Sequence, residues 1–385
     1  MGRFRDALVA PGLTAIAEVK RRSPSAGELR PNADPAALAA AYEQAGAAAV
    51  SILVDARFAG SWEDLSAARA AASLPLLAKG FFSTEEDLRT AREAGADAAL
   101  LLLRDLDDDT ARCLLGAASE LGLDALVEAH DADELQRATR LGACVVGINA
   151  RDLSTFEVDR RRQLELVSQA PRDHIVVAES GIESRAQGAA AELAGADAIL
   201  VGSALMRAAD PAAKLAELIS RPLVKVCGLT RSDDVDAAAA AGADLAGFIL
   251  ADGSPRRASR VLEVPETMLS VAVHVGEPGE EEADLVQLYP REAGKVRGRD
   301  AVLLRDGREV ARVLDQPWDE REPGHLERAR ATTGRIMLAG GLGPENVRAA
   351  IEAVRPWAVD AASSLESAPG IKDHERVRSY VAAAR

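Results

Sequence analysis

One pattern repeats through the first 220 residues: a short apolar run, a loop, and an alanine-rich stretch of helical periodicity that ends near a glycine. Apolar runs without alternating polar residues are typical of parallel strands covered on both faces. Eight such units match a (β/α)8 barrel, whereas doubly wound sheets rarely need eight equivalent strands. The expected strands are residues 16–20, 50–53, 76–79, 98–103, 125–128, 145–149, 175–179 and 199–201.

Length and charge limit the remaining possibilities. A chain of 385 residues fits two domains, and its net charge of -15 argues against a phosphate-backbone partner such as nucleic acid. Its three cysteines lie far apart, which suggests neither a disulfide framework nor a zinc site. No apolar run approaches the ~20 residues that cross a bilayer. We therefore expect a cytoplasmic, monomeric protein that binds neither nucleic acid nor membrane, and no pattern indicates a metal or cofactor.

Polar side chains gather where the expected strands end. Residues two apart on a strand share a face, so Glu18 and Lys20 point into one space. Later strands end in further polar or small residues, namely Lys79, Glu128, Asn149, Arg151, Glu179, Ser180, Gly181, Gly202 and Ser203. Each alone would be an ordinary strand-end residue or surface ion pair, but active sites of this fold lie at this edge. Together they predict paired acids and bases beside a phosphate site.

Five segments in the first half resemble indole-3-glycerol-phosphate synthase: residues 17–25 (AEVKRRSPS), 79–82 (KGFF), 147–152 (GINARD), 178–182 (AESGI) and 202–206 (GSALM). The resemblance implies ring closure of 1-(2-carboxyphenylamino)-1-deoxyribulose 5-phosphate to the indole, with loss of carbon dioxide and water. By resemblance, Lys79 is the principal general acid, and Lys20 and Glu128 also transfer protons. Substrate contacts are implied for Glu18, Asn149, Arg151 and Glu179, phosphate contacts for Ser23, Ser180, Gly181, Gly202 and Ser203, and ring contacts for Phe58 and Phe81.

Two features of this half depart from that family's pattern. Gly80 replaces the usual aspartate after the proposed acid, and most of the amino-terminal helical extension is missing. We expect residues 3–12 to cover the barrel mouth instead.

The pattern restarts after residue 220, so we predict domains at 1–220 and 221–385. Residues 223–231 (LVKVCGLTR), 253–257 (GSPRR), 286–288 (VQL), 338–346 (LAGGLGPEN) and 359–373 (VDAASSLESAPGIKD) resemble phosphoribosylanthranilate isomerase. The implied reaction is a cofactor-free Amadori rearrangement of N-(5-phosphoribosyl)anthranilate, whose product is the synthase substrate. The resemblance implies Cys227 as base and Asp315 as acid, with Arg256, Asp360, Gly340, Gly341, Ser363 and Ser364 contacting substrate or phosphate.

The middle of this half departs from the family. Residues 287–290 read QLYP where the family has QLHG, and the glycine-rich loop expected after Asp315 is replaced. Asp306 and Gly307 stand between two apolar runs, a strong hairpin signal. We therefore predict two consecutive (β/α)8 barrels of which the second is modified or incomplete, because an antiparallel hairpin replaces one β/α unit.

Three functional interpretations remain open. The first is a bifunctional enzyme that takes phosphorylated anthranilate substrates through both steps. The second is a monofunctional synthase with a structural or ligand-binding carboxyl-terminal barrel. The third is an isomerase half that accepts the related aminoaldose of histidine biosynthesis.

Overall fold

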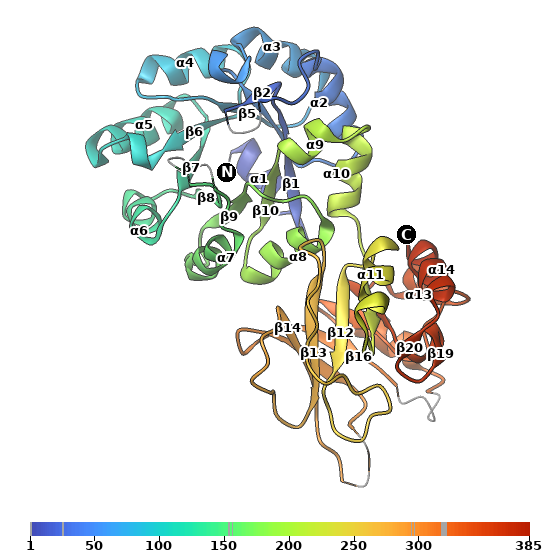
Figure 1. Ribbon diagram of the computed structural model, residues 1–385. Coiled ribbons are helices and arrows are strands. Elements are labelled where there is room, and N and C mark those ends of the chain that lie inside the picture. Colours follow the sequence, from blue (N-terminus) through green and yellow to red (C-terminus); the bar gives the residue numbers. More distant parts are fainter. Residues whose placement is uncertain are drawn as a thin grey trace. The chain divides into compact units, whose positions relative to one another are not determined.

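The chain divides into two units, each built around its own closed barrel (Figure 1). The computed structural model describes residues 2–24, 27–152, 155, 157–293, 295, 297–316 and 322–385. One unit comprises Met1–Glu183 and Gly188–Ile219, and the other comprises Ser184–Gln187 and Ser220–Arg385. The division into domains at 1–220 and 221–385 stays a prediction.

All eight strands of the first barrel are parallel, as predicted. They close in the order β1-β10-β9-β8-β7-β6-β5-β4, with β1 pairing to β4. Their bounds are β1 Thr14–Val19, β4 Ala49–Leu53, β5 Leu76–Lys79, β6 Ala98–Leu102, β7 Asp124–Ala129, β8 Val145–Asn149, β9 Ile175–Glu179 and β10 Ala198–Val201. A short pair, β2 Arg22–Ser23 and β3 Gly27–Glu28, extends from the end of β1.

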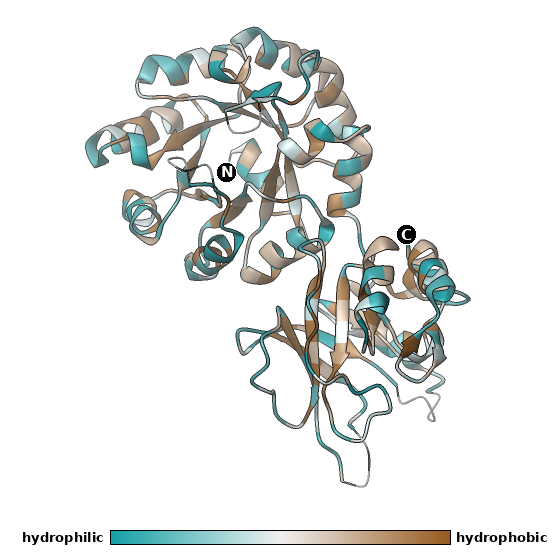
Figure 2. Cartoon of the chain, viewed as in Figure 1, coloured by the Kyte–Doolittle hydropathy of each residue, from teal (hydrophilic) through white to brown (hydrophobic). Residues whose placement is uncertain are grey.

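Helices surround these strands and turn their polar faces outward (Figure 2). Side chains cap several of them: the Asp34 carboxylate accepts from the amide of Ala36 before the helix that begins at Pro35, and Ser61 and Thr84 form capping boxes. The bounds are α2 Pro35–Gln44, α3 Trp62–Ala71, α4 Glu85–Glu93, α5 Asp108–Glu120, α6 Ala132–Leu141, α7 Arg160–Gln169, α8 Arg185–Ala194, α9 Ser203–Arg207 and α10 Pro211–Ile219, with short 3-10 turns η1 Ala56–Phe58 and η2 Leu103–Asp105.

The amino-terminal helix α1, Arg3–Leu8, covers the opposite end of the barrel from the one expected. Phe4 and Leu8 are fully buried against the apolar interior of the barrel. The backbone amide of Arg5 donates to Asp124, at the start of β7, so the helix lies at the amino ends of the strands. The expectation that residues 3–12 cover the active-site mouth is wrong, because the two apolar side chains fill the barrel floor.

The second barrel also closes with eight strands, in the order β11-β12-β13-β14-β15-β16-β17-β18. Their bounds are β11 Leu223–Cys227, β12 Leu245–Ile249, β13 Leu269–Val275, β14 Leu285–Tyr289, β15 Ala301–Arg305, β16 Arg308–Leu314, β17 Ile336–Leu338 and β18 Ala358–Ala361. A small pair of strands, β19 Glu366–Ala368 and β20 Ile371–Lys372, follows the turn η3 Ser363–Leu365.

The predicted hairpin is confirmed. Strand β15 runs antiparallel to both β14 and β16, and Asp306 and Gly307 form the turn with φ of 49° and 73°. Two consecutive positive φ values are those of a type I′ turn, whose twist matches that of the flanking strands. Of the two forms expected, the barrel is modified rather than incomplete, because β15 fills the place of a parallel strand and hydrogen bonding continues around the circle.

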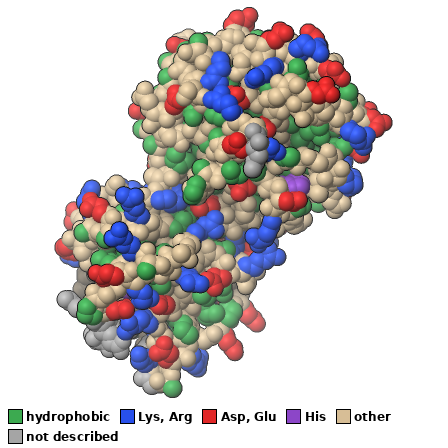
Figure 3. Space-filling view, turned by 180° about the vertical axis from the view of Figure 1, so that it is seen from behind, with side chains coloured by type: hydrophobic (Ala, Val, Ile, Leu, Met, Phe, Trp, Pro, Cys, Tyr) green, Lys and Arg blue, Asp and Glu red, His purple; other side chains and the backbone are tan. Residues whose placement is uncertain are grey.

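Helices cover only part of the second barrel. They are α11 Ser232–Ala240, α12 His325–Ala331, α13 Val347–Val354 and α14 His374–Ala384. Residues 250–268 and 276–284, which link β12 to β13 and β13 to β14, contain no helix. In the part of the chain that the structure describes, no helix is long and apolar enough to cross a membrane. On the face shown in Figure 3, acidic and basic side chains are interspersed.

Candidate active sites

Lys79 is the centre of the polar cluster at the carboxyl edge of the first barrel. It ends β5, and its Nζ lies 2.7 Å from Glu179, 3.3 Å from Glu18 and 3.9 Å from Glu128. These glutamates come from β9, β1 and β7, so the topology brings four distant residues into one space. Every one of the three carboxylates is buried. The predicted gathering of acids and bases is therefore present.

Burial and charge set the protonation of this cluster. Burial opposes the charge on Lys79, but the carboxylates of Glu179, Glu18 and Glu128 outweigh it and hold the lysine pKa above its ordinary value. Burial raises the pKa of Glu179 to about 7, with Lys79 opposing the rise. One oxygen of Glu179, Oε1, is buried without a hydrogen-bond partner among the described residues. The site thus combines a protonated lysine with a carboxyl group poised near neutrality.

Lys20 and Glu18 form the second acid–base pair, with 2.7 Å between Nζ and Oε1. Gly202 lies directly against them, since a Cβ there would come within 2.3 Å of Glu18 Oε1 and 3.2 Å of Lys20 Nζ. Burial raises the pKa of Glu18, but Lys20 and Lys79 overcome this and keep it below its usual range. A glycine at position 202 is needed because the backbone approaches the pair so closely.

Glu128 is held by a residue that the sequence analysis missed. His130 Nε2 lies 3.1 Å from Glu128 Oε1, and its Nδ1 lies 3.1 Å from Glu134. The amide of Asn149 also donates to Glu128, at 3.0 Å. Burial opposes protonation of His130, but the two carboxylates raise its pKa to about 10. Glu128 is therefore fixed in place as an ionised group, with its pKa lowered by His130, Lys79 and Asn149 against the effect of burial.

Two aromatic side chains stand near this edge on neighbouring loops. Phe58, in η1 after β4, and Phe81, after β5, stack with ring centroids 6.3 Å apart, and Arg57 lies 3.5 Å over the Phe81 ring. The structure also explains the departure at Gly80, where a Cβ would come within 2.7 Å of the Phe82 ring. An aspartate at this position would displace the packing of Phe82.

The candidate phosphate residues lie on loops that follow the same strand ends. Ser180 and Gly181 both have positive φ, 70° and 69°, directly after β9. Gly202 and Ser203 form the start of α9 after β10, and Ser23 is buried on β2. The backbone amide of Arg151, the next candidate, donates to Asn149 Oδ1 at 2.9 Å. All these residues therefore share the edge that carries Lys79.

Cys227 ends the first strand of the second barrel and is 5 % exposed. Lys225, two residues earlier on the same face, is fully buried and bonds Asp360 on β18 and Gln287 on β14, each at 2.8 Å. Burial raises the pKa of the Cys227 thiol, and the ammonium of Lys225 opposes this. Asp360 Oδ1 is buried with no hydrogen-bond partner among the described residues. The cysteine, lysine and carboxylate form one cluster.

A hydrogen-bonded chain links this cluster to Asp315, which follows β16. Gln287 donates to the hydroxyl of Tyr289 at 2.8 Å, and Tyr289 donates to Asp315 at 2.6 Å. Arg297 forms an ion pair with the same carboxylate oxygen at 2.7 Å. Burial raises the pKa of Asp315, while Arg297 and Tyr289 oppose the rise. The tyrosine that departs from the family motif thus contacts the candidate acid.

Arg256 is paired in the described structure. Its Nε lies 2.9 Å from Glu366, which also contacts the buried Lys372 at 3.0 Å. The candidate phosphate loops lie after β17 and β18: Gly340 and Gly341 have φ of 94° and 71°, and the Ser364 hydroxyl donates to the carbonyl of Leu342. Ser363 is exposed beside it. These contacts place Ser364 in the framework of the loop.

Several residues with polar contacts in the two sites were not predicted, among them His130, Lys225, Gln287, Tyr289 and Arg297. A signal existed for Lys225, because its spacing of two from Cys227 is the same argument that joined Glu18 to Lys20. For Arg297 no signal was available, since it lies in the segment without family resemblance.

Comparison with known proteins agrees with both halves. A family model described as indole-3-glycerol phosphate synthase matches residues 3–218, and one described as N-(5'phosphoribosyl)anthranilate (PRA) isomerase matches residues 324–383. The chain is 47% identical over 215 residues to indole-3-glycerol phosphate synthase from Mycobacterium ulcerans, covering 56% of this chain and 79% of the relative. The Micrococcus luteus synthase is 48% identical over 201 residues, 52% of this chain and 75% of the relative.

Among solved structures, a phosphoribosyl anthranilate isomerase from Thermus thermophilus is 29% identical, covering 42% of this chain and 97% of that chain with a TM-score of 0.35. Fold and site together define a (β/α)8-barrel enzyme whose acidic and basic side chains gather at the carboxyl ends of the strands. The chain belongs to the indole-3-glycerol phosphate synthase family. With the isomerase segment in its second unit, it is a bifunctional synthase and isomerase of tryptophan biosynthesis, which favours the first of the three interpretations.

Proposed function

We propose that the first barrel closes the indole ring through Lys79. The contacts of 2.7 to 3.9 Å between its Nζ and three buried carboxylates carry this proposal, because they keep the lysine protonated at neutral pH. Lys79 donates its proton to the substrate's carbonyl oxygen while the ring carbon that bears the carboxylate attacks the carbonyl carbon. Carbon dioxide then leaves, and the electrons of the broken bond restore the aromatic ring.

Loss of water completes the reaction. One of Lys20 and Glu128 protonates the departing hydroxyl, and the other takes the proton that leaves as the double bond forms. Glu18, Asn149, Arg151 and Glu179 hold and polarise the substrate, and the Phe58–Phe81 pair packs against its ring. Ser23, Ser180, Gly181, Gly202 and Ser203 are the proposed phosphate contacts.

The second barrel is proposed to rearrange N-(5-phosphoribosyl)anthranilate. Asp315 protonates the ribose ring oxygen so that the C1–O bond breaks and the nitrogen lone pair forms an iminium. Cys227, after its thiol has lost a proton to solvent, takes the proton from C2 to give the enolamine. The enolamine becomes the aminoketone when C1 gains a proton and the C2 hydroxyl loses one. Arg256 and Asp360 contact the substrate, and Gly340, Gly341 and Ser363 hold the phosphate, with Ser364 supporting their loop.

Variants of Lys79 and Asp315 test the two sites separately. General acids contribute roughly a hundredfold or more, so Lys79→Met is expected to lower synthase turnover by about that factor and leave isomerase turnover unchanged. Asp315→Asn is expected to do the reverse. Lys214→Met and Asp252→Asn, at an exterior helix and an exposed loop, serve as controls. Full synthase turnover in Lys79→Met would reject the first assignment.

Phosphorylated substrates suit both barrels. The finer expectations of a monomer, a cytoplasmic location and no nucleic-acid partner stay predictions, which sedimentation and fractionation would test.

A further inference from the structure

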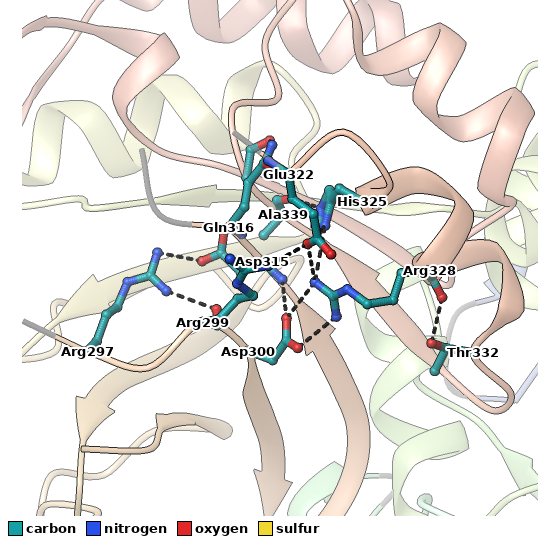
Figure 4. Close-up of polar contacts among 11 residues, drawn as sticks. Arg297, Arg299, Asp300, Asp315, Gln316, Glu322, His325, Arg328, Thr332 and Ala339 are labelled. Atoms are coloured by element: carbon teal, nitrogen blue, oxygen red, sulfur yellow. Dashed lines mark hydrogen bonds and ion pairs between the residues drawn. The ribbon is translucent and has the colours of Figure 1, made fainter. Parts of the chain in front are cut away.

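Arg297 lies in the segment that replaces a β/α unit of the second barrel, between β14 and β15. Its guanidinium forms an ion pair with Asp315 at 2.7 Å and lies 4.1 Å over the ring of Tyr289. The same guanidinium donates to the carbonyl of Gly298, and to that of Arg299, as Figure 4 shows. With 27% of its side chain exposed, Arg297 has solvent on one side and the candidate acid on the other.

The segment that carries Arg297 is tied to the rest of the site (Figure 4). Arg328, on α12, forms an ion pair with Asp300 at 2.7 Å, and Asp300 in turn accepts from the backbone amide of Asp315 at 2.9 Å. Arg299 lies 2.9 Å from Glu322. These bonds anchor the backbone that follows Arg297, so its side chain can change partner while that backbone keeps its place.

The ion pair conflicts with the role proposed for Asp315. A general acid must carry a proton before it donates it, whereas a guanidinium at 2.7 Å favours the ionised carboxylate. The substrate brings a competing anion, because its anthranilate ring bears a carboxylate that matches the guanidinium as a two-oxygen acceptor. Arg256, the other cation expected to hold substrate, is engaged with Glu366.

We propose that Arg297 is a specificity-determining residue of the second site, which exchanges Asp315 for the carboxylate of the anthranilate ring and thereby frees Asp315 to act as acid. The proposal rests on the proposed isomerase function. Asp315 takes its proton from solvent when the guanidinium leaves, and no further reactant is needed. Substrates without the ring carboxylate would leave the ion pair intact and the acid ionised.

Inhibition of isomerase turnover by two matched probes tests this exchange in the full chain. One probe is the reduced, non-reacting form of the rearrangement product, and the other is the same molecule without its ring carboxylate. Because isomerase turnover is the readout, binding of either probe to the first barrel does not affect the measured inhibition. A charge-assisted pair contributes roughly ten- to a hundredfold in affinity, so the wild-type chain is expected to prefer the carboxylated probe by about that factor.

Arg297→Met is expected to reduce this preference by about tenfold or more, with little change in the inhibition constant of the probe that lacks the carboxylate. Arg312→Met, at an arginine on β16 whose side chain is 62% exposed, removes the same charge away from the site and is expected to keep the wild-type preference. An equal preference in Arg297→Met and wild type would overturn the proposal. No isomerase turnover in the wild type would instead reject the proposed function, so the two failures are distinguishable.

Discussion

Replacement of Glu179 by glutamine should make the protein more stable and less active. Burial raises the pKa of this carboxyl group from 4.5 to about 7, and the folded protein therefore resists its ionisation. At about 1.4 kcal/mol per pKa unit, the shift corresponds to about 3 kcal/mol of unfolding free energy lost at alkaline pH. A glutamine keeps the shape of the side chain and has no charge to bury.

The sign of this effect depends on pH. Between pH 4.5 and 7 the folded carboxyl keeps its proton while the unfolded one loses it, so wild-type stability falls as pH rises through this window. Glu179→Gln removes that fall. The difference in unfolding free energy between variant and wild type is expected to be near zero below pH 4.5 and to reach about 3 kcal/mol at pH 8.

Urea unfolding of the full chain at several pH values measures this difference, because contributions from the second unit cancel between variant and wild type. Glu165→Gln, an exposed position on α7, is the control and should show little change at any pH. At pH 8, where Glu179 is ionised, synthase turnover of Glu179→Gln is expected to fall at least about tenfold, since the charge facing Lys79 is lost. A stability difference that is flat with pH, or that favours the wild type at pH 8, would refute the reasoning.

Three further substitutions have defined outcomes. Lys225→Met leaves Asp360 buried and unpaired, which should cost about 3–5 kcal/mol in urea unfolding of the second unit; a loss below 1 kcal/mol would contradict the burial of the pair. Gly147→Ala would place a Cβ 2.0 Å from Glu179 Oε1, so synthase turnover should fall at least about tenfold while isomerase turnover is unchanged. Gly307→Ala strains a turn residue with φ of 73° and should lower the stability of the second unit by about 1 kcal/mol, an effect that thermal unfolding would detect and that an unchanged midpoint would exclude.

The sequence predicted the first barrel well because uniformly apolar strands and capped helices alternate without interruption. It also predicted the hairpin at Asp306 and Gly307, since a two-residue turn carries its own local signal. The sequence did not predict that the second barrel closes around β15, because strand pairing depends on contacts between residues distant in sequence. The end of the barrel covered by α1 was missed for the same reason.

The sites follow the same division. Residues at strand ends, such as Glu18 and Lys79, could be placed on one edge from topology alone. Two ion pairs could not be predicted in this way: Arg256 with Glu366, and Arg297 with Asp315. Both arginines are long side chains on loops, and neither residue spacing nor periodicity indicates which partner such a side chain contacts. The motif resemblance identified Asp315 as a candidate acid. Its contacts with Tyr289 and Arg297 became apparent only in the structure.

The central claim is that one chain performs two consecutive reactions at two separate sites. Its most direct test is a time course with N-(5-phosphoribosyl)anthranilate alone, following loss of substrate fluorescence and appearance of indole absorbance in wild type, Lys79→Met and Cys227→Ser. The account predicts that wild type converts the substrate to the indole product, that Lys79→Met stops at the aminoketone, and that Cys227→Ser does not begin. The account would be contradicted if the wild-type chain left the substrate fluorescence unchanged while it still closed the ring of added aminoketone.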